Sequence, residues 1–119
     1  MILSKDKSIL YVDAWTPTEL WAHRSSLVAF KTATGERTPF EIPYYRPEIP
    51  TAPGEIYSMV LSPDGNTLYV GGLIGLIGGQ TRSNLAAINL TDGTVTSFGP
   101  IVDSWIQDMA LSSDGQILY

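Results

Sequence analysis

The residues best able to do chemistry are few and scattered along the chain. The protein has one histidine, His23, and no cysteine. A Ser–His–Asp site needs a serine and a carboxylate held beside the imidazole, and no motif brings either group to His23. Clustered metal ligands and calcium-binding loops are also missing from the sequence. We therefore expect no catalytic residues of its own, no cofactor and no bound metal.

Glycines crowd the stretch LYVGGLIGLIGG at residues 68–79. A phosphate-binding loop places its glycines as G-x-x-x-x-G-K-[ST] or G-x-G-x-x-G, between a strand and a helix. Neither spacing is present, and the element that follows is predicted to be a strand. The stretch is too short and too rich in glycine to span a membrane. These glycines are predicted to serve a connection with positive φ and close backbone approach.

Aromatic side chains are the third group that could bind a ligand. They gather in WTPTELWAH (15–23) and PYYRPEIP (43–50), and a further tryptophan precedes an alternating segment. Such side chains can stack on a sugar or hold a peptide, and they can equally fill gaps between structural units. The candidate binding residues are Trp15, Trp21, His23, Tyr44, Tyr45, Arg46 and Trp105.

An internal repeat defines the elements that must position these residues. LSKDKSILYV (3–12), LSPDGNTLYV (61–70) and LSSDGQILY (111–119) are copies of one phrase. The first and second copies align at an offset of 58, and the second and third at an offset of 50. Residues 1–119 therefore form one unit, with a first repeat over about 3–60, a second over about 61–110 and the start of a third at 111–119.

Each repeat carries only β signals. Alternating segments such as IYSMVLS are followed by turns that combine aspartate with glycine. Four short strands in a repeat of 50 to 58 residues are typical of a propeller blade. We expect an all-β fold: a β-propeller segment of about two four-stranded antiparallel blades and the start of a third. A β-sandwich is the main alternative, but sandwiches seldom repeat strand by strand. The predicted turn residues are Asp64, Gly65, Asp92, Gly93, Asp114 and Gly115.

The order SPDG, LYVGG, IGG, an arginine, NLAAI and DG within residues 55–100 resembles the delta-60 repeat of bacterial β-propellers. The phrase SPDGNTLYV is also similar to YVTN-type propeller blades. The first repeat departs from the pattern, because DAWTPTELWAH (13–23) stands where double glycines should be. The resemblance implies a bacterial protein that is extracellular or on the cell surface, and it implies no characteristic enzymatic activity.

Blade topology predicts where the long connections meet. In four antiparallel strands, the connections after the second and fourth strands leave from one face, and the tight turns leave from the other. The long connections are 13–25, 41–54, 71–83 and 99–104. The aromatic candidates should therefore gather on one face, and long loops on a rigid scaffold often bind ligands. A capping box from Thr16 to Glu19 predicts one helical turn in the connection 13–25.

The net charge of the chain and the placement of its charged residues exclude some classes of partner. The net charge of −5 argues against nucleic acid, and the scattered lysines and arginines argue against an anionic membrane surface or membrane insertion. We expect a non-enzymatic protein that acts in binding, adhesion or structural display. Its partners would be the remaining propeller blades or identical subunits, together with a glycan or protein ligand. The alternatives are a piece of an enzymatic propeller with its catalytic residues in other blades, and a subunit of a ring or filament built from two-blade units.

Overall fold

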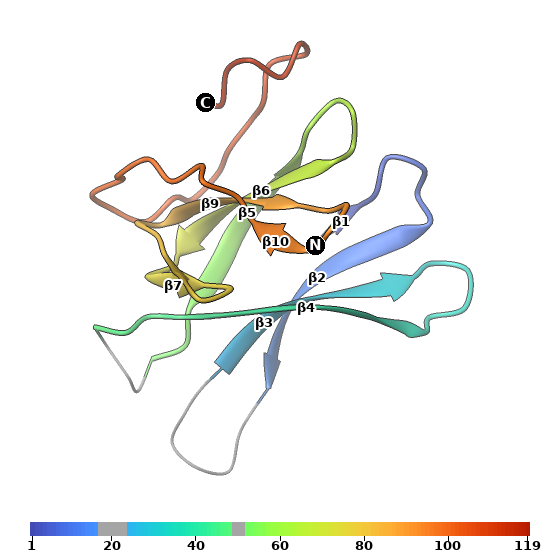
Figure 1. Ribbon diagram of the computed structural model, residues 1–119, viewed down its shortest axis with the longest axis horizontal. Helices are drawn as coiled ribbons and strands as arrows, with labels where there is room; N and C mark the ends of the chain where they lie inside the picture. Colours follow the sequence, from blue (N-terminus) through green and yellow to red (C-terminus); the bar gives the residue numbers. More distant parts are fainter. Residues whose placement is uncertain (17–23, 49–51) are drawn as a thin grey trace.

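The computed structural model describes residues 1–16, 24–48 and 52–119, and every regular element among them is a β-strand (Figure 1). The all-β prediction is confirmed. Two antiparallel sheets enclose a shared core, and the inner strands of the two sheets lie beside each other.

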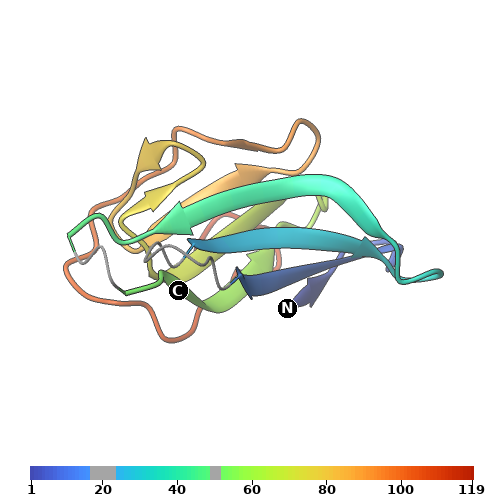
Figure 2. The ribbon, with the colours of Figure 1, turned by 90° about the horizontal axis from the view of Figure 1, so that it is seen from below.

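The first repeat folds into four consecutive antiparallel strands (Figure 2). These strands are β1 (Ile2–Leu3), β2 (Ile9–Thr16), β3 (Arg24–Lys31) and β4 (Arg37–Tyr45). The second sheet forms in the same manner, in the order β5-β6-β9-β10. Its strands are β5 (Glu55–Leu61), β6 (Thr67–Leu73), β9 (Leu85–Asn89) and β10 (Thr94–Val95). Its first strand begins at Glu55, so from here on the second repeat is counted from Glu55 and the third, at the offset of 50, from Trp105. In the third repeat, Leu111 and Leu118 form an isolated antiparallel bridge.

The glycine-rich connection contains a hairpin that the sequence reading did not predict. Strands β7 (Leu76–Ile77) and β8 (Gln80–Thr81) pair with each other, and β7 pairs with β4 of the first repeat. The two residues between them, Gly78 and Gly79, have φ values of +54° and +78°. A two-residue loop with both φ values positive is the turn that matches the twist of a hairpin. The first sheet therefore has six strands, and part of the second repeat extends it.

Strands β2 and β3 are longer than expected. The sequence predicts a connection over residues 13–25, but β2 continues to Thr16 and β3 already begins at Arg24. Trp15 is consequently a strand residue that pairs with Ser25. Tryptophan and threonine favour extended backbone, which explains the continuation. The helical turn predicted from Thr16 onward falls on residues outside the described ranges.

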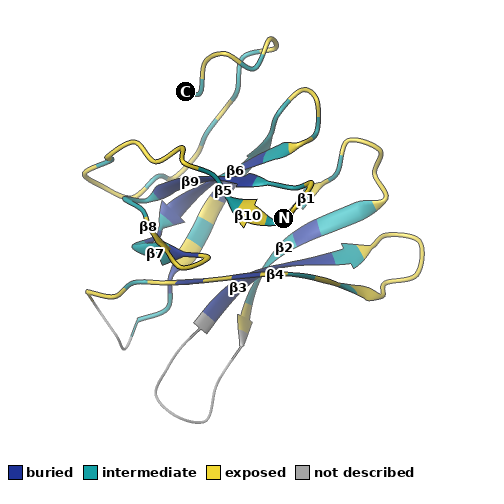
Figure 3. Ribbon diagram, viewed as in Figure 1, coloured by how far each residue is buried: buried dark blue, intermediate teal, exposed yellow. Residues whose placement is uncertain are grey.

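The core lies between the two sheets (Figure 3). Buried and exposed positions alternate toward the end of β4, whereas most of β3 and β9 is buried on both faces. Burying one such aliphatic or aromatic side chain contributes about 1.5–3 kcal/mol. From the first sheet the core receives Tyr11, Leu27, Ala29, Ile42 and Tyr44, and from the second it receives Leu68, Val70, Ala86 and Ile88.

The turn after the first strand of each repeat is one structure built three times. A serine hydroxyl donates to the aspartate Oδ1 at 2.7, 2.5 and 2.6 Å in successive repeats. The same Oδ1 accepts the backbone N–H two residues after the aspartate. These bonds stabilise the carboxylate and lower its pKa, to about 2 for Asp6. The serines are Ser4, Ser62 and Ser112, and the aspartates are Asp6, Asp64 and Asp114.

The glycines of these turns take the left-handed conformation. Gly65 and Gly115 have φ values of +83° and +73°. In the turn before β10, Gly93 has φ +71° and Asp92 accepts the N–H of Thr94 at 3.0 Å. All six residues that the sequence assigned to turns therefore lie in turns.

Candidate functional site

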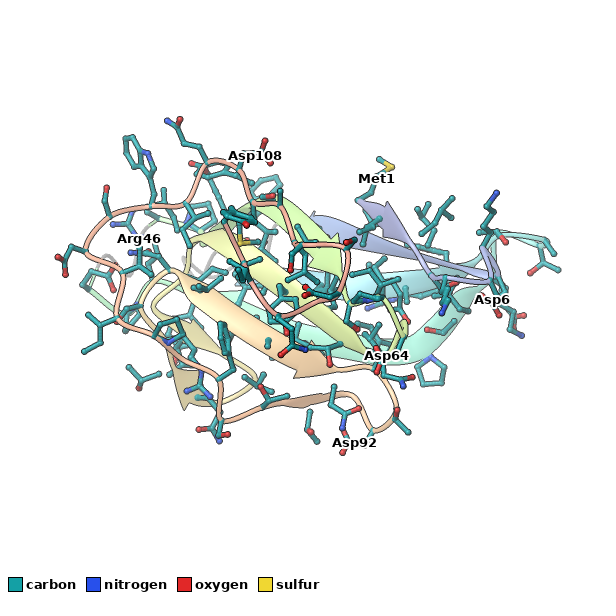
Figure 4. All side chains as sticks on the ribbon, turned by 90° about the horizontal axis from the view of Figure 1, so that it is seen from above. Met1, Asp6, Arg46, Asp64, Asp92 and Asp108 are labelled. Carbon is teal, nitrogen blue, oxygen red and sulfur yellow. The ribbon has the colours of Figure 1, made fainter. Side chains whose placement is uncertain are left out.

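The long connections leave the sheets at one end of the molecule, which we name the long-connection end. Figure 4 shows Arg46 there, with Asp6, Asp64 and Asp92 of the tight turns toward the opposite end. Backbone hydrogen bonds join connections from different repeats, such as Gly75 N–H to the Tyr45 carbonyl at 3.2 Å. This end therefore offers side chains from several connections to solvent.

Tyr44 does not belong to this surface. Its side chain is fully buried, and its hydroxyl donates to the carboxylate of Asp13. A Cβ on Gly54 would lie only 2.7 Å from the Tyr44 ring, so the glycine makes room for it. Burial is the main cause of the raised pKa of Tyr44. The expectation that Tyr44 faces a ligand is wrong, because it lies on the same inward face of β4 as Ile42.

The other candidates are spread over the long-connection end. Trp15 is 55% exposed at the end of β2, and Tyr45 is 39% exposed on the outward face of β4. Arg46 forms an ion pair with Glu48, with 3.0 Å between Nε and Oε1. Trp105 is 53% exposed. Trp21 and His23 lie outside the described residues.

Trp105 shares a hollow of about 280 Å³ with Tyr57 and Gln107. Tyr57 is 48% exposed, and the sequence reading missed it. It sits at a β-bulge, because Ile56 pairs with Gly72 whereas Ser58 pairs with Gly71. A bulge bends the strand and redirects a side chain, and bulges are common beside functional sites.

The segment that carries Trp105 and Gln107 is held on β5 and β6 by its other residues. Ile106 N–H donates to the Gly72 carbonyl at 3.3 Å, and a Cβ on Gly71 would lie 2.8 Å from an Ile106 methyl carbon. Met109 N–H donates to Ser58 Oγ at 3.0 Å. Because side chains alternate along an extended chain, anchoring Ile106 leaves its neighbours Trp105 and Gln107 free to line the hollow.

Three charged groups near the hollow, Glu55, Arg46 and Glu48, each have a side-chain partner. The Tyr57 hydroxyl donates to the Glu55 carboxylate, and this bond is the main cause of the raised pKa of Tyr57. The positive charge of Arg46 lowers the pKa of the same phenol, so Arg46 lies close enough to interact with it electrostatically. Arg46 is itself paired with Glu48.

No protein-family model matches the chain. No curated protein matches it.

A second, larger hollow of about 730 Å³ lies between β9 and the C-terminal segment and shares Trp105 and Gln107 with the first. Apolar residues dominate its lining, among them Leu85, Ile106, Met109 and Leu118. Leu85 is equivalent to Leu27, which the second sheet buries completely. This hollow is therefore the counterpart, in the second repeat, of the surface around Leu27 that the second sheet covers.

Among the described residues, no three histidine, aspartate or glutamate side chains gather as a metal site. None of the described residues forms a helix able to cross a membrane. The hollow at Tyr57 instead offers two aromatic faces, one amide and a phenol–carboxylate pair. Such a set can stack on a ring and exchange hydrogen bonds with its polar rim.

Proposed function

We propose that the chain is a segment of a β-propeller whose long-connection end binds a ligand, in adhesion or display. The observation that carries the proposal is one contact that recurs along the chain. A Cβ on Gly65 would lie 2.9 Å from Lys5 of the preceding repeat, and a Cβ on Gly115 would lie 2.9 Å from Pro63. Lys5 and Pro63 are equivalent positions, as are Gly65 and Gly115. One movement that carries each repeat onto the next is how a propeller is built.

The faces of the two sheets support the same arrangement. Leu68 and Val70 of the second sheet are fully buried against the first. Their equivalents Leu10 and Val12 lie on the face of the first sheet that points away from the core, and they are only partly buried. Leu3 on this face is 43% exposed. A preceding repeat would bury this face as the first sheet buries the second, and burial of apolar area would stabilise the contact.

The role outside the cell rests on the resemblance of residues 55–100 to the delta-60 repeat. Binding rather than catalysis is proposed because the exposed rings of Tyr57 and Trp105 and the Gln107 amide meet in one hollow at the long-connection end. The carboxylates of Glu48 and Glu55 are engaged with Arg46 and Tyr57. A general acid or base would need a carboxyl or imidazole free to exchange a proton with a substrate.

Arrays of glycans and peptides test the binding role. We expect the arrays to show a ligand that binds the unchanged chain. Its binding should be lost in Trp105→Ala, which removes an exposed ring from the long-connection end. The matched variant Lys31→Ala, which removes an exposed ion pair with Glu36 near the tight turns, should bind normally. A ligand lost in Lys31→Ala and kept in Trp105→Ala would overturn the proposal, as would the failure of both arrays.

The open face of the first sheet also supports a second candidate, a ring or filament assembled from copies of the chain. Sedimentation of the unchanged chain and of Leu10→Asp shows whether identical subunits or further repeats of one polypeptide cover this face. Association that disappears in Leu10→Asp favours assembly from identical subunits, because a buried charge opposes contact through this face. A monomer in both samples favours blades supplied by one longer polypeptide.

A further inference from the structure

We infer that the hollow between Tyr57, Trp105 and Gln107 binds the ring of a neutral sugar. The inference rests on the proposed binding role of the long-connection end, and it adds the class of ligand. Four features of the hollow lead to it: exposed aromatic faces, a rigid support, groups that both donate and accept hydrogen bonds, and opposite charges on Glu55 and Arg46 beside it.

The aromatic faces come from successive repeats. Tyr57 belongs to β5, and Trp105 lies at the equivalent part of the third repeat, so both reach the same hollow. About half of each side chain is exposed, 48% for Tyr57 and 53% for Trp105. The C–H face of a pyranose ring is flat and apolar, and covering these rings with it removes apolar surface from water.

The support is rigid before any ligand arrives. Ile106 is anchored on Gly71 and Gly72, and Met109 is bonded to Ser58, so the segment between them has little freedom. The bulge holds the backbone of Tyr57, and the Glu55 carboxylate holds its hydroxyl. Side chains that are already placed lose little entropy on binding, which favours a small ligand that makes few contacts.

The polar groups suit hydroxyl partners. The Gln107 amide has two N–H donors and a carbonyl acceptor, and the Glu55 carboxylate keeps acceptor sites beyond the one used by Tyr57. Each sugar hydroxyl can donate one hydrogen bond and accept others. A ring edged with hydroxyl groups therefore satisfies both kinds of group in the hollow at once.

Charge argues against an ionic ligand. An anion would meet Glu55 in a protein whose net charge is −5. A cation would be attracted by Glu55, whose partner Tyr57 is neutral, but it would also be repelled by the guanidinium of Arg46, which acts on the same phenol. Neither sign of charge gains a clear advantage, which leaves a neutral ligand.

The size of the hollow limits what can enter. Its volume of about 280 Å³ is below the roughly 300–1,000 Å³ of sites for drug-sized ligands. It accommodates one sugar ring, such as a monosaccharide or the end of a glycan chain.

Two-dimensional NMR of the full chain tests the inference. Methyl glycosides of glucose, galactose, mannose and N-acetylglucosamine are each titrated to high millimolar concentration. The indole N–H of Trp105 and the side-chain amide of Gln107 are followed. We expect at least one sugar to give saturable shifts at both groups. The affinity should fall at least several-fold in Gln107→Ala, an exposed and structurally safe substitution, and binding should be lost in Tyr57→Ala and Trp105→Ala. Lys31→Ala, near the tight turns at the opposite end of the molecule, is the control and should bind normally.

The opposing results separate this inference from the proposed function. If no sugar shifts either signal but a peptide with an aromatic or basic side chain does, the binding role stands and the sugar is wrong. If neither sugars nor peptides shift any signal at the long-connection end, both proposals fall. Sugar binding that survives in Tyr57→Ala, Trp105→Ala and Gln107→Ala would also overturn the assignment, because it would place the sugar elsewhere.

Discussion

Ser58 and Asp108 occupy equivalent positions in consecutive repeats, and their side chains are hydrogen-bonded across the boundary, with 3.1 Å between Ser58 Oγ and Asp108 Oδ1. The same hydroxyl accepts the backbone N–H of Met109 at 3.0 Å. Ser58 is buried on β5, so one hydroxyl satisfies two groups of the next repeat. This small polar junction holds the third repeat on the second.

Removing this hydroxyl should loosen the third repeat. Ser58→Ala takes away one partner of the Met109 N–H and one of the Asp108 carboxylate. A lost hydrogen bond of this kind costs about 1 kcal/mol in free energy of unfolding. Denaturant unfolding should show that loss, and amide hydrogen exchange at Met109 should be faster. The exposed Ser104 supplies the control, since Ser104→Ala should leave both measurements unchanged; equal effects of the two substitutions would contradict the account.

Lys7→Gly should stabilise the protein. Lys7 has φ +64° and stands where the later repeats have Gly65 and Gly115. A side chain in this left-handed region costs about 1–2 kcal/mol, which glycine avoids. Glycine loses more conformational entropy on folding, and this loss offsets part of the gain. We expect a net gain of up to about 1 kcal/mol by thermal or denaturant unfolding. The reverse exchange, Gly65→Lys, should destabilise, and a gain there would rule out this explanation.

Stability should decline at acid pH because of the repeated turns. Hydrogen bonds lower the pKa of Asp6 to about 2 and lower those of Asp64, Asp92 and Asp114. A lowered pKa stabilises the fold above the ordinary aspartate value of about 3.9, and that contribution is lost as pH falls toward the folded value. Carbon NMR titration should show Asp6 as the last of these carboxylates to protonate. In Asp6→Asn the acid decline should be smaller, and an unchanged decline would contradict the assignment.

The buried phenol of Tyr44 should couple stability to alkaline pH. Tyr44→Phe leaves the Asp13 carboxylate without its donor, so we expect a loss of about 2 kcal/mol at neutral pH, the range for bonds to charged groups. The pKa of Tyr44 is raised in the folded state, so its contribution is present below about pH 10 and lost as pH rises above it. The free energies of unfolding of the unchanged chain and of Tyr44→Phe, measured at several pH values, should therefore converge as the pH rises above about 10. Tyr45→Phe, on the exposed side of β4, should cost little at any pH.

Much of the architecture follows from local patterns. The copies of one phrase predicted equivalent strands, and the Asp–Gly pairs predicted the turns at residues 64, 92 and 114, because both depend on neighbouring residues. The inward direction of Tyr44 was also readable, since it lies two residues after the buried Ile42 and side chains alternate along a strand.

Contacts between repeats could not be read in the same way. The bulge at Tyr57 depends on how closely β5 approaches β6, where a Cβ on Gly72 would lie 2.0 Å from the Glu55 carbonyl oxygen. The pairing of β7 with β4 joins residues from different repeats, and no local pattern specifies its partner. The hollow at Trp105 follows from both repeats together, so a single segment does not reveal it.

In a propeller, each repeat is carried onto the next by the same rotation about one axis. The chain has no cysteine, so spin labels can be attached in pairs at the exposed, equivalent positions Ser8, Asn66 and Gln116. Electron paramagnetic resonance then gives three distances. We expect equal distances for 8–66 and 66–116, and a distance for 8–116 that is clearly shorter than their sum. Unequal neighbouring distances, or a distance for 8–116 equal to the sum as in a straight stack, would contradict the propeller arrangement.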